Sequence, residues 1–278
     1  MTAKRSAISL AVIAAMSILL SCSSGPSAPE MGTPAFYWQG AREVYAAGDY
    51  MKTVQNLDNL LATDNEYTAR ALPWVLVLKS GLAAGYMDAA ENYQVGVRNN
   101  KTDPGAFRSL VTAYRNSAAQ LALQFAEDFG RLDKLKGDTV KLEFSYPRGN
   151  AAPVAQFTKV TTGIALTAPE TESAQQRALE RGVLLAACHA AGAANDTAKT
   201  EEMLKAGSAT VPRSTFMTAM ADSLYQLSQL YVRDKLDDPQ KMGALLQRAQ
   251  NALTGVPESK ETKDLNRQID AALKKMKK

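Results

Sequence analysis

The chain has 278 residues, 46% of them apolar, and its 32 lysine and arginine residues stand against 28 acidic ones, a formal net charge of +4. Two of the cations fall in the first 21 residues and four more in the final KKMKK, so the body between the two ends is close to neutral. This balance excludes a nucleic-acid-binding protein of the strongly basic kind, because phosphate backbones select concentrated positive surfaces.

The first 20 residues have the composition of an export signal. Lys4 and Arg5 precede an uncharged apolar run from Ala7 to Leu20. As a helix, this run extends about 21 Å, less than the roughly 30 Å of hydrocarbon that a membrane-spanning helix must cross. A basic start, a short apolar core and small residues after it are typical of a signal that is removed on export.

The letters LLSC, which end at Cys22, resemble the lipobox of bacterial lipoproteins, although Leu20 is bulkier than the residue usual at its position. The resemblance implies that residues 1–21 are a signal peptide and that Cys22 becomes a lipid-carrying N-terminus. Ser23 at the next position implies the outer membrane, where the organism has one. An ordinary secretory signal with an incidental cysteine is the alternative.

The segment after Cys22 predicts a flexible tether. Residues 22–35 are rich in serine, proline and glycine and hold almost no large apolar side chain, so they bury too little surface to offset the entropy cost of ordering. The remainder, residues 36–278, is expected to form a single domain. Such a tether has a typical span of about 20 Å, which would hold the domain just off the lipid surface.

Helical periodicity dominates this domain. Asp103 can cap a helix in which Pro104 occupies the first turn, and apolar residues recur at three- and four-residue spacing as far as Phe129. Glycines between such runs predict short turns. Further helices are predicted at about 173–191, 216–232, 240–253 and 260–276, and the turn glycines are Gly48, Gly85, Gly130, Gly192, Gly207 and Gly255.

Two segments, which begin at Tyr37 and Trp74, repeat at a distance of 37 residues. In each, an aromatic residue precedes by eleven positions a glycine, Gly48 or Gly85, that is followed by a tyrosine. These residues resemble the tetratricopeptide repeat, in which two antiparallel helices pack around small residues, although neither copy ends with the expected proline. A looser third copy runs from about 216 to 256. The resemblance implies an all-α fold, a solenoid of antiparallel helical hairpins.

In the tetratricopeptide family the first helix of each repeat lines a concave binding surface. Carried onto this sequence, the resemblance implies a surface for an extended peptide with a carboxylate and an apolar or aromatic side chain. The alternative is that Trp38 is buried and Arg42 is a solvated charge. The residues expected on this surface are Trp38, Arg42 and Tyr45 in the first copy and Val75, Lys79 and Leu82 in the second.

One segment departs from the helical pattern. Apolar and polar residues alternate between Val140 and Tyr146, which is the period of an extended strand with one apolar face. No second clear strand is nearby. The segment is therefore expected to be either a connector packed on helices or an arm that fills a groove or pairs with another chain.

Motifs for catalysis are nearly absent. Cys188 and His189 are adjacent, but neighbouring helical residues point about 100° apart, so we expect a structural cysteine and no catalytic role for either. With Cys22 lipidated, Cys188 has no partner for a disulfide. His189 is the only histidine, so a site with two histidines around a metal is excluded, and neither a metal nor another cofactor is expected.

Together these features predict a lipid-anchored envelope scaffold, facing the periplasm, that binds a protein or peptide and is not an enzyme. The alternative is an accessory subunit for small-molecule uptake, similar to the helical lipoproteins of tripartite ATP-independent periplasmic transporters. A cell-wall hydrolase is a third possibility. An open groove favours the scaffold, an enclosed apolar cavity favours uptake, and a cleft with paired buried carboxylates favours the enzyme.

Overall fold

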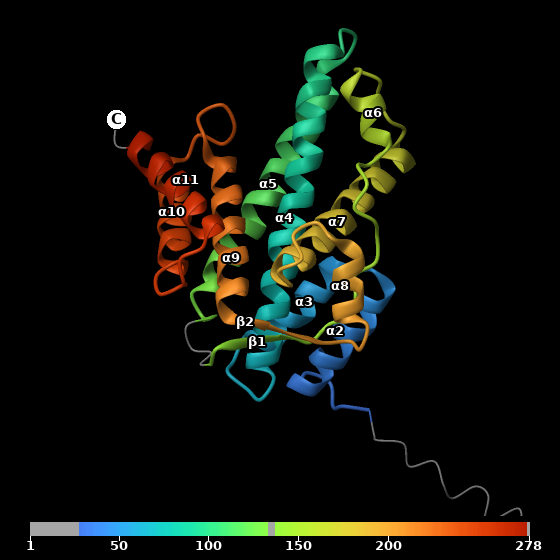
Figure 1. Ribbon diagram of the computed structural model, residues 1–278. Coiled ribbons are helices and arrows are strands. Elements are labelled where there is room, and N and C mark those ends of the chain that lie inside the picture. The colour runs from blue at the N-terminus through green and yellow to red at the C-terminus, as the bar shows by residue number, and fades with distance from the viewer. Residues whose placement is uncertain (1–27, 133–136, 277–278) are drawn as a thin grey trace, which may run out of the picture.

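The computed structural model describes residues 28–132 and 137–276, and these residues form an almost entirely helical domain (Figure 1). None of the described helices combines the length and apolarity needed to cross a lipid bilayer. The helices are α2 (Pro34–Ala47), α3 (Tyr50–Leu61), α4 (Thr68–Asn99), α5 (Pro104–Phe129), α6 (Gln156–Thr161), α7 (Ala168–Ala190), α8 (Thr197–Leu204), α9 (Arg213–Ser228), α10 (Pro239–Ala252) and α11 (Lys260–Met276), with a 3-10 turn, η2 (Gln229–Tyr231), after α9.

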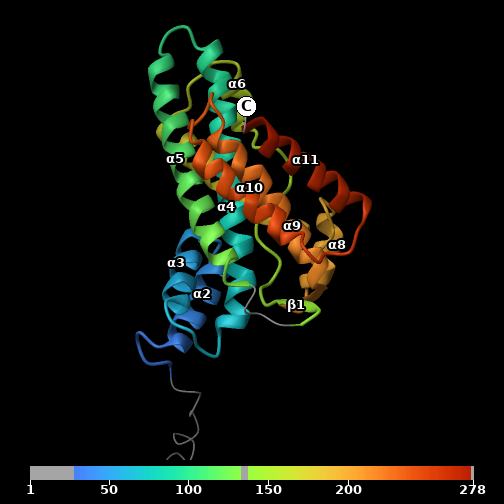
Figure 2. The same ribbon diagram turned by 90° about the vertical axis from the view of Figure 1, so that its left-hand side faces the viewer.

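Helix α4 is the centre of the fold. It packs against α3, α5, α6, α7 and α9 (Figures 1 and 2). Every residue from 71 to 80 is buried. A helix that is apolar on all sides must be enclosed by other elements, since no face of it can be left to water. The neighbouring helices therefore surround α4, and the predicted solenoid of successive hairpins is not confirmed.

The first predicted hairpin is confirmed. Gly48 ends α2 with a φ of 86°, a left-handed conformation that favours glycine, and the side chain of Asp49 accepts a hydrogen bond from the Lys52 backbone N–H to start α3. Helix α2 begins at Pro34, capped by Thr33, so the helical domain starts two residues before its predicted start at residue 36. Cys22 lies outside the described residues.

The second predicted hairpin is wrong. Helix α4 passes through Gly85 without a break, and its 32 residues occupy the place of two predicted helices and the turn between them. The aromatic-to-glycine spacing predicts a turn, but at Gly85 the absence of a side chain allows α4 to pack closely against α7. A methyl group added there would lie 2.5 Å from the Ala178 carbonyl oxygen of α7.

The later helices follow the prediction closely. Helix α5 ends at Phe129 as expected, and the Asp103 side chain caps its first turn. Helices α7, α9, α10 and α11 lie within a few residues of the predicted ranges. Helices α9 and α10 pack against each other, which is the pairing that the third repeat implied.

The extended segment pairs within the chain. Strand β1 (Thr139–Leu142) is antiparallel to β2 (Ala209–Pro212), with Val140 opposite Val211. The expectation that no second strand lies nearby is wrong, because four residues of strand, β2, are too few to show a period of two. Beyond β1, Phe144 is buried among aromatic side chains of α2 and α4, and this contact fixes the strand pair beside the first hairpin.

Candidate functional site

The predicted peptide-binding surface is wrong for five of its six residues. Trp38 and Tyr45 are buried at 7% and 4% exposure and form edge-to-face contacts with Trp74 of α4. Val75 and Leu82 are completely buried. The error follows from the continuous α4, which presents these positions to the surrounding helices and not to a concave surface. Of the three residues predicted from the first copy, only Arg42 is exposed, which agrees with the alternative of a buried Trp38 and a solvated Arg42.

Lys79, the sixth residue, is 3% exposed and lies in a buried ionic cluster. Its Nζ donates to Asp58 of α3 and to Asp128 of α5, both at 2.7 Å. Burial raises the pKa of the Asp58 carboxyl, and the ammonium of Lys79 opposes that rise. Because Lys79 ties three helices together at this point, its role is structural. The ammonium of Lys79 compensates the charge of both carboxylates only in part, and Arg131 adds a second cation beside Asp128 at 3.7 Å.

The most distinctive packing in the domain is the crossing of α4 and α7. Gly81 and Gly85 on α4 meet Gly182 on α7, and the two backbones approach so closely that an added methyl group at Gly182 would lie 2.1 Å from the Gly81 carbonyl oxygen. Small residues at four-residue spacing allow this kind of close helix contact. The crossing fixes α7 against α4, and α9 packs against both.

A cleft of about 360 Å³ opens where α4, α7 and α9 meet. It lies beside the glycine crossing, and we call it the three-helix cleft. Its wall includes Ala84 from α4 and Gln226 from α9, both exposed, so the cleft is open to solvent. Ligand pockets generally range from about 300 to 1,000 Å³, so the three-helix cleft is of a size for a few side chains.

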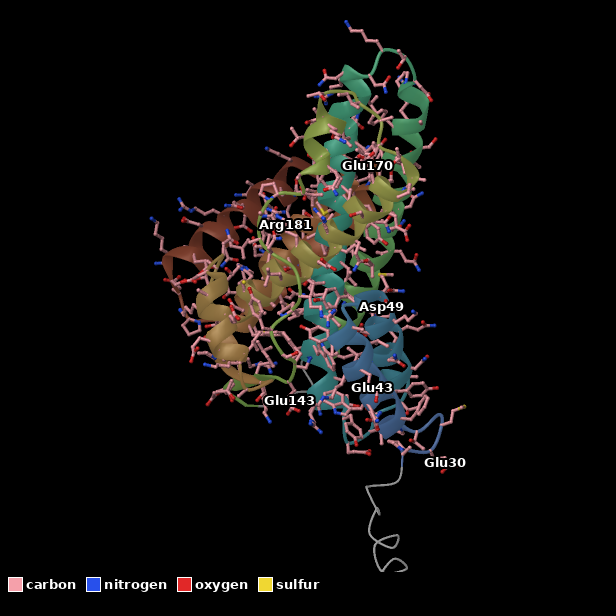
Figure 3. All side chains as sticks on the ribbon, turned by 90° about the vertical axis from the view of Figure 1, so that its right-hand side faces the viewer. Glu30, Glu43, Asp49, Glu143, Glu170 and Arg181 are labelled. Carbon is pink, nitrogen blue, oxygen red and sulfur yellow. The ribbon has the colours of Figure 1, made fainter. Side chains whose placement is uncertain are left out.

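Two half-exposed ion pairs lie at this cleft. The Arg181 guanidinium of α7 lies 3.3 Å from Asp88 of α4, and its Nε donates to the Ala151 carbonyl oxygen at 3.0 Å. Figure 3 shows Arg181 midway along the molecule, far from Glu30 at the N-terminal end. His189 Nε2 lies 3.5 Å from an Asp222 carboxylate oxygen of α9, which pairs the two when the imidazole is protonated.

The serine hydroxyls of the three-helix cleft donate hydrogen bonds to backbone carbonyl oxygens of their own helices. Ser80 Oγ donates to the Val77 carbonyl oxygen, and Ser223 Oγ donates to the Ala219 carbonyl oxygen. Neither makes a hydrogen bond to His189 in the described residues. Among the described residues, the three-helix cleft therefore brings neither serine hydroxyl to the His189–Asp222 pair.

Cys188 points away from its neighbour. It is completely buried inside α7, whereas the His189 side chain is 29% exposed. Burial raises the pKa of the Cys188 thiol, which keeps it in its protonated, unreactive form. Both positions agree with the expected buried cysteine and histidine at its edge, and the absence of a catalytic role stays a prediction.

His189 also borders a second cleft of about 400 Å³, formed by the end of α7, the start of α9 and the loop before α11. The two clefts share this side chain and run on either side of it. A third cleft, of about 370 Å³, lies between α3 and α5 and is lined by amide side chains, including Gln55, Asn59 and Gln120. Every cleft in this set has a polar, solvent-facing wall.

Residues 28–132 and 137–276 contain no group of three or more histidine, cysteine, aspartate or glutamate side chains that could hold a metal. Comparison of the chain with protein-family models, with curated proteins and with solved structures gives no match. Any function proposed for the three-helix cleft must therefore be argued from the geometry of the cleft itself.

Sequence reasoning did not find the three-helix cleft. Arg181 and Asp88 are 93 positions apart, and no local pattern pairs them. A signal was present in the glycines: Gly81 and Gly85 stand four apart inside an apolar run, which is typical of a helix crossing. Read in that way, the two glycines would have indicated close packing instead of a turn.

Proposed function

We propose that the protein is an exported, lipid-anchored envelope protein that binds a segment of another protein in the three-helix cleft. The anchor part of the proposal is supported by the short apolar run before Cys22, the LLSC letters and the proline-, serine- and glycine-rich residues that follow. Helix α2 begins only twelve residues after Cys22, so the anchored domain would stay close to the membrane.

The open cleft with partly solvated ion pairs is the observation that carries the binding part of the proposal. The side chains of Arg181 and Asp222 are 26% and 34% exposed, so each can exchange water for a partner group without leaving its own helix. Such groups provide a donor fork and an acceptor within one cleft, as a peptide backbone and its polar side chains require.

The shape of the clefts favours protein binding over the alternatives. A small-molecule uptake subunit requires a cavity that encloses its ligand, whereas the three-helix cleft is open and has exposed residues in its wall. A hydrolase built on carboxylates requires an acid and a base in one cleft, whereas the half-exposed Asp58 and the buried Asp128 are both held by Lys79. We therefore do not propose either activity.

Site-specific photo-cross-linking in the intact envelope tests the cleft. A photoreactive phenylalanine derivative at Ala84, an exposed residue of the cleft wall, should give an adduct with a defined protein partner on irradiation. The same derivative at Ala113, exposed on α5 and outside the clefts described above, is the matched control. Equal cross-linking from both positions, or none from Ala84, would show that the cleft is not the binding site.

The anchor is tested separately by mass spectrometry of the mature N-terminal peptide. A diacylated or triacylated Cys22 is expected, because stable attachment needs more than one chain. An unmodified peptide that starts at Ser23 or later contradicts the anchor. That result leaves the cleft proposal standing, since the cross-linking experiment depends only on export.

A further inference from the structure

Arg115 of α5 is a buried cation without a carboxylate. It is 9% exposed, its Nη2 reaches only the Gln94 side-chain oxygen at 3.3 Å, and its Nε has no hydrogen-bond partner among the described residues. Lys79, the other buried cation, is held by two carboxylates at 2.7 Å. Burial of a guanidinium is costly unless an anion compensates its charge. Among the described residues, no carboxylate compensates the charge of Arg115.

The surroundings of Arg115 are also positive. Glu91 of α4 forms an ion pair with Lys235 at 2.7 Å, and the Arg115–Gln94 contact lies one turn further along the same face of α4. Arg98 follows Gln94 by four residues, so it lies on that face too. Arg108 precedes Arg115 by seven residues, two turns of α5, and lies on the face of α5 that carries Arg115.

Helices α4 and α5 are antiparallel and joined by a short turn, so these positions meet on one side of the pair. Arg98 and Arg108 are exposed and form no ion pair within the described part of the chain. We call Arg98, Arg108 and Arg115 the arginine face. The acidic residue nearest in sequence to Arg98 and Arg108 is the exposed Asp103, which caps the first turn of α5, and Glu91 is already paired with Lys235. The face therefore keeps a net positive charge in a nearly neutral protein.

The position of the arginine face limits what can bind it. In Figures 1 and 2 the α4–α5 turn lies at the opposite end of the molecule from the start of α2. Helix α4 has 32 residues and so extends about 48 Å between these ends. An anchor at Cys22 would therefore join the domain to its membrane at the end opposite the arginine face, and an exported protein does not meet nucleic acid as a regular partner.

We propose that the arginine face binds an acidic segment of a partner protein. Guanidinium groups bind carboxylates through two parallel N–H···O bonds, and three of them along two neighbouring helices suit a run of aspartate or glutamate side chains. The inference rests on the proposed role in protein binding and adds a second contact surface to it, with defined chemistry.

Fluorescence anisotropy with a short labelled oligoglutamate peptide tests the proposal on the purified domain with its tether. The double variant Arg98→Gln/Arg108→Gln should weaken binding at least about tenfold, roughly 1.4 kcal/mol. Arg42→Gln/Arg177→Gln is the control, because it removes the same charge from two exposed residues on α2 and α7 and should change the Kd less than about twofold. Equal losses in the two double variants would overturn the proposal.

Arg115→Gln separates binding from a structural role. If the unpaired guanidinium awaits a partner, the variant should bind oligoglutamate more weakly and keep or raise the melting temperature. A lower melting temperature with unchanged binding would show that Arg115 is structural and would overturn its assignment. Tighter binding to inorganic phosphate, or to phosphatidylglycerol vesicles, than to the peptide would assign the face to a phosphate group instead. Failure of the natural domain to bind oligoglutamate, together with a specific cross-link at Ala84, would refute this inference and leave the proposed cleft binding standing.

Discussion

Replacement of Gly182 by alanine tests the crossing on which the three-helix cleft is built. The added methyl carbon would lie 2.1 Å from the Gly81 carbonyl oxygen and 2.8 Å from the Gly85 nitrogen. An ordinary contact begins near 3.4 Å, so the two backbones would have to separate by roughly 1 Å, and neither can rotate aside as a side chain would. We expect α7 to be displaced from α4 and the cleft to change shape.

The cost follows from two opposed terms. Overpacking a well-packed contact typically costs about 1–3 kcal/mol, and the rigid backbone at this crossing places Gly182→Ala at the upper end. Replacement of a helical glycine by alanine stabilises the helix by about 0.5–1 kcal/mol, because alanine loses less backbone entropy on folding. The net loss should be about 2 kcal/mol in the free energy of unfolding, which lowers the melting temperature of a domain of this size by about 4–8 °C.

Gly243→Ala on α10 is the matched control. The new methyl group there would meet only the terminal carbon of Met276 at 3.1 Å, and that flexible side chain can move. The control should therefore be neutral or slightly stabilising, by up to about 0.5–1 kcal/mol. Urea unfolding followed by circular dichroism measures both variants. If Gly182→Ala unfolds within about 0.5 kcal/mol of the natural protein, the close crossing is not a constraint and the reasoning fails.

Three further predictions concern single side chains. Lys79→Met should destabilise the domain by about 2–3 kcal/mol in urea unfolding, because the buried Asp128 loses its closest cation while the half-exposed Asp58 stays solvated, and an unchanged midpoint would contradict the cluster. A hydrogen bond from Lys159, with the cap of α7, lowers the pKa of Glu170 to about 2. The stability from this carboxylate is complete above its ordinary pKa of 4.5 and disappears as the pH falls toward 2, so Glu170→Gln should flatten this part of the acid-unfolding curve. Cys188→Ala should cost about 1 kcal/mol and leave the Ala84 cross-link unchanged, and the native thiol should react with a thiol reagent only after unfolding. Rapid labelling of the folded protein would refute its burial.

The structure shows which sequence signals were sufficient. Helix α5 was predicted to the residue at its C-terminal end because Asp103, Pro104 and the apolar period agree over seven turns. Strand β2 was missed because Ala209–Pro212 is too short to carry a period, and its partner β1 is some 70 positions away. The three-helix cleft was missed for the same reason: its ion pairs join residues that are distant in the sequence, and pairing of this kind depends on tertiary packing.

The central mistake, the division of α4 into two helices, has a physical explanation that the sequence already contained. A helix of a repeat hairpin packs on one or two sides, so it should keep a polar stripe. From Ala71 to Leu78 the chain has no polar side chain at all, and the first charge, Lys79, is buried with two carboxylates. A run of this kind indicates a helix enclosed on every side. The proposed partner contacts accordingly lie on elements that keep polar, exposed faces: α7 and α9 around the three-helix cleft, and the outer half of the α4–α5 pair, where Arg98 and Arg108 reach solvent.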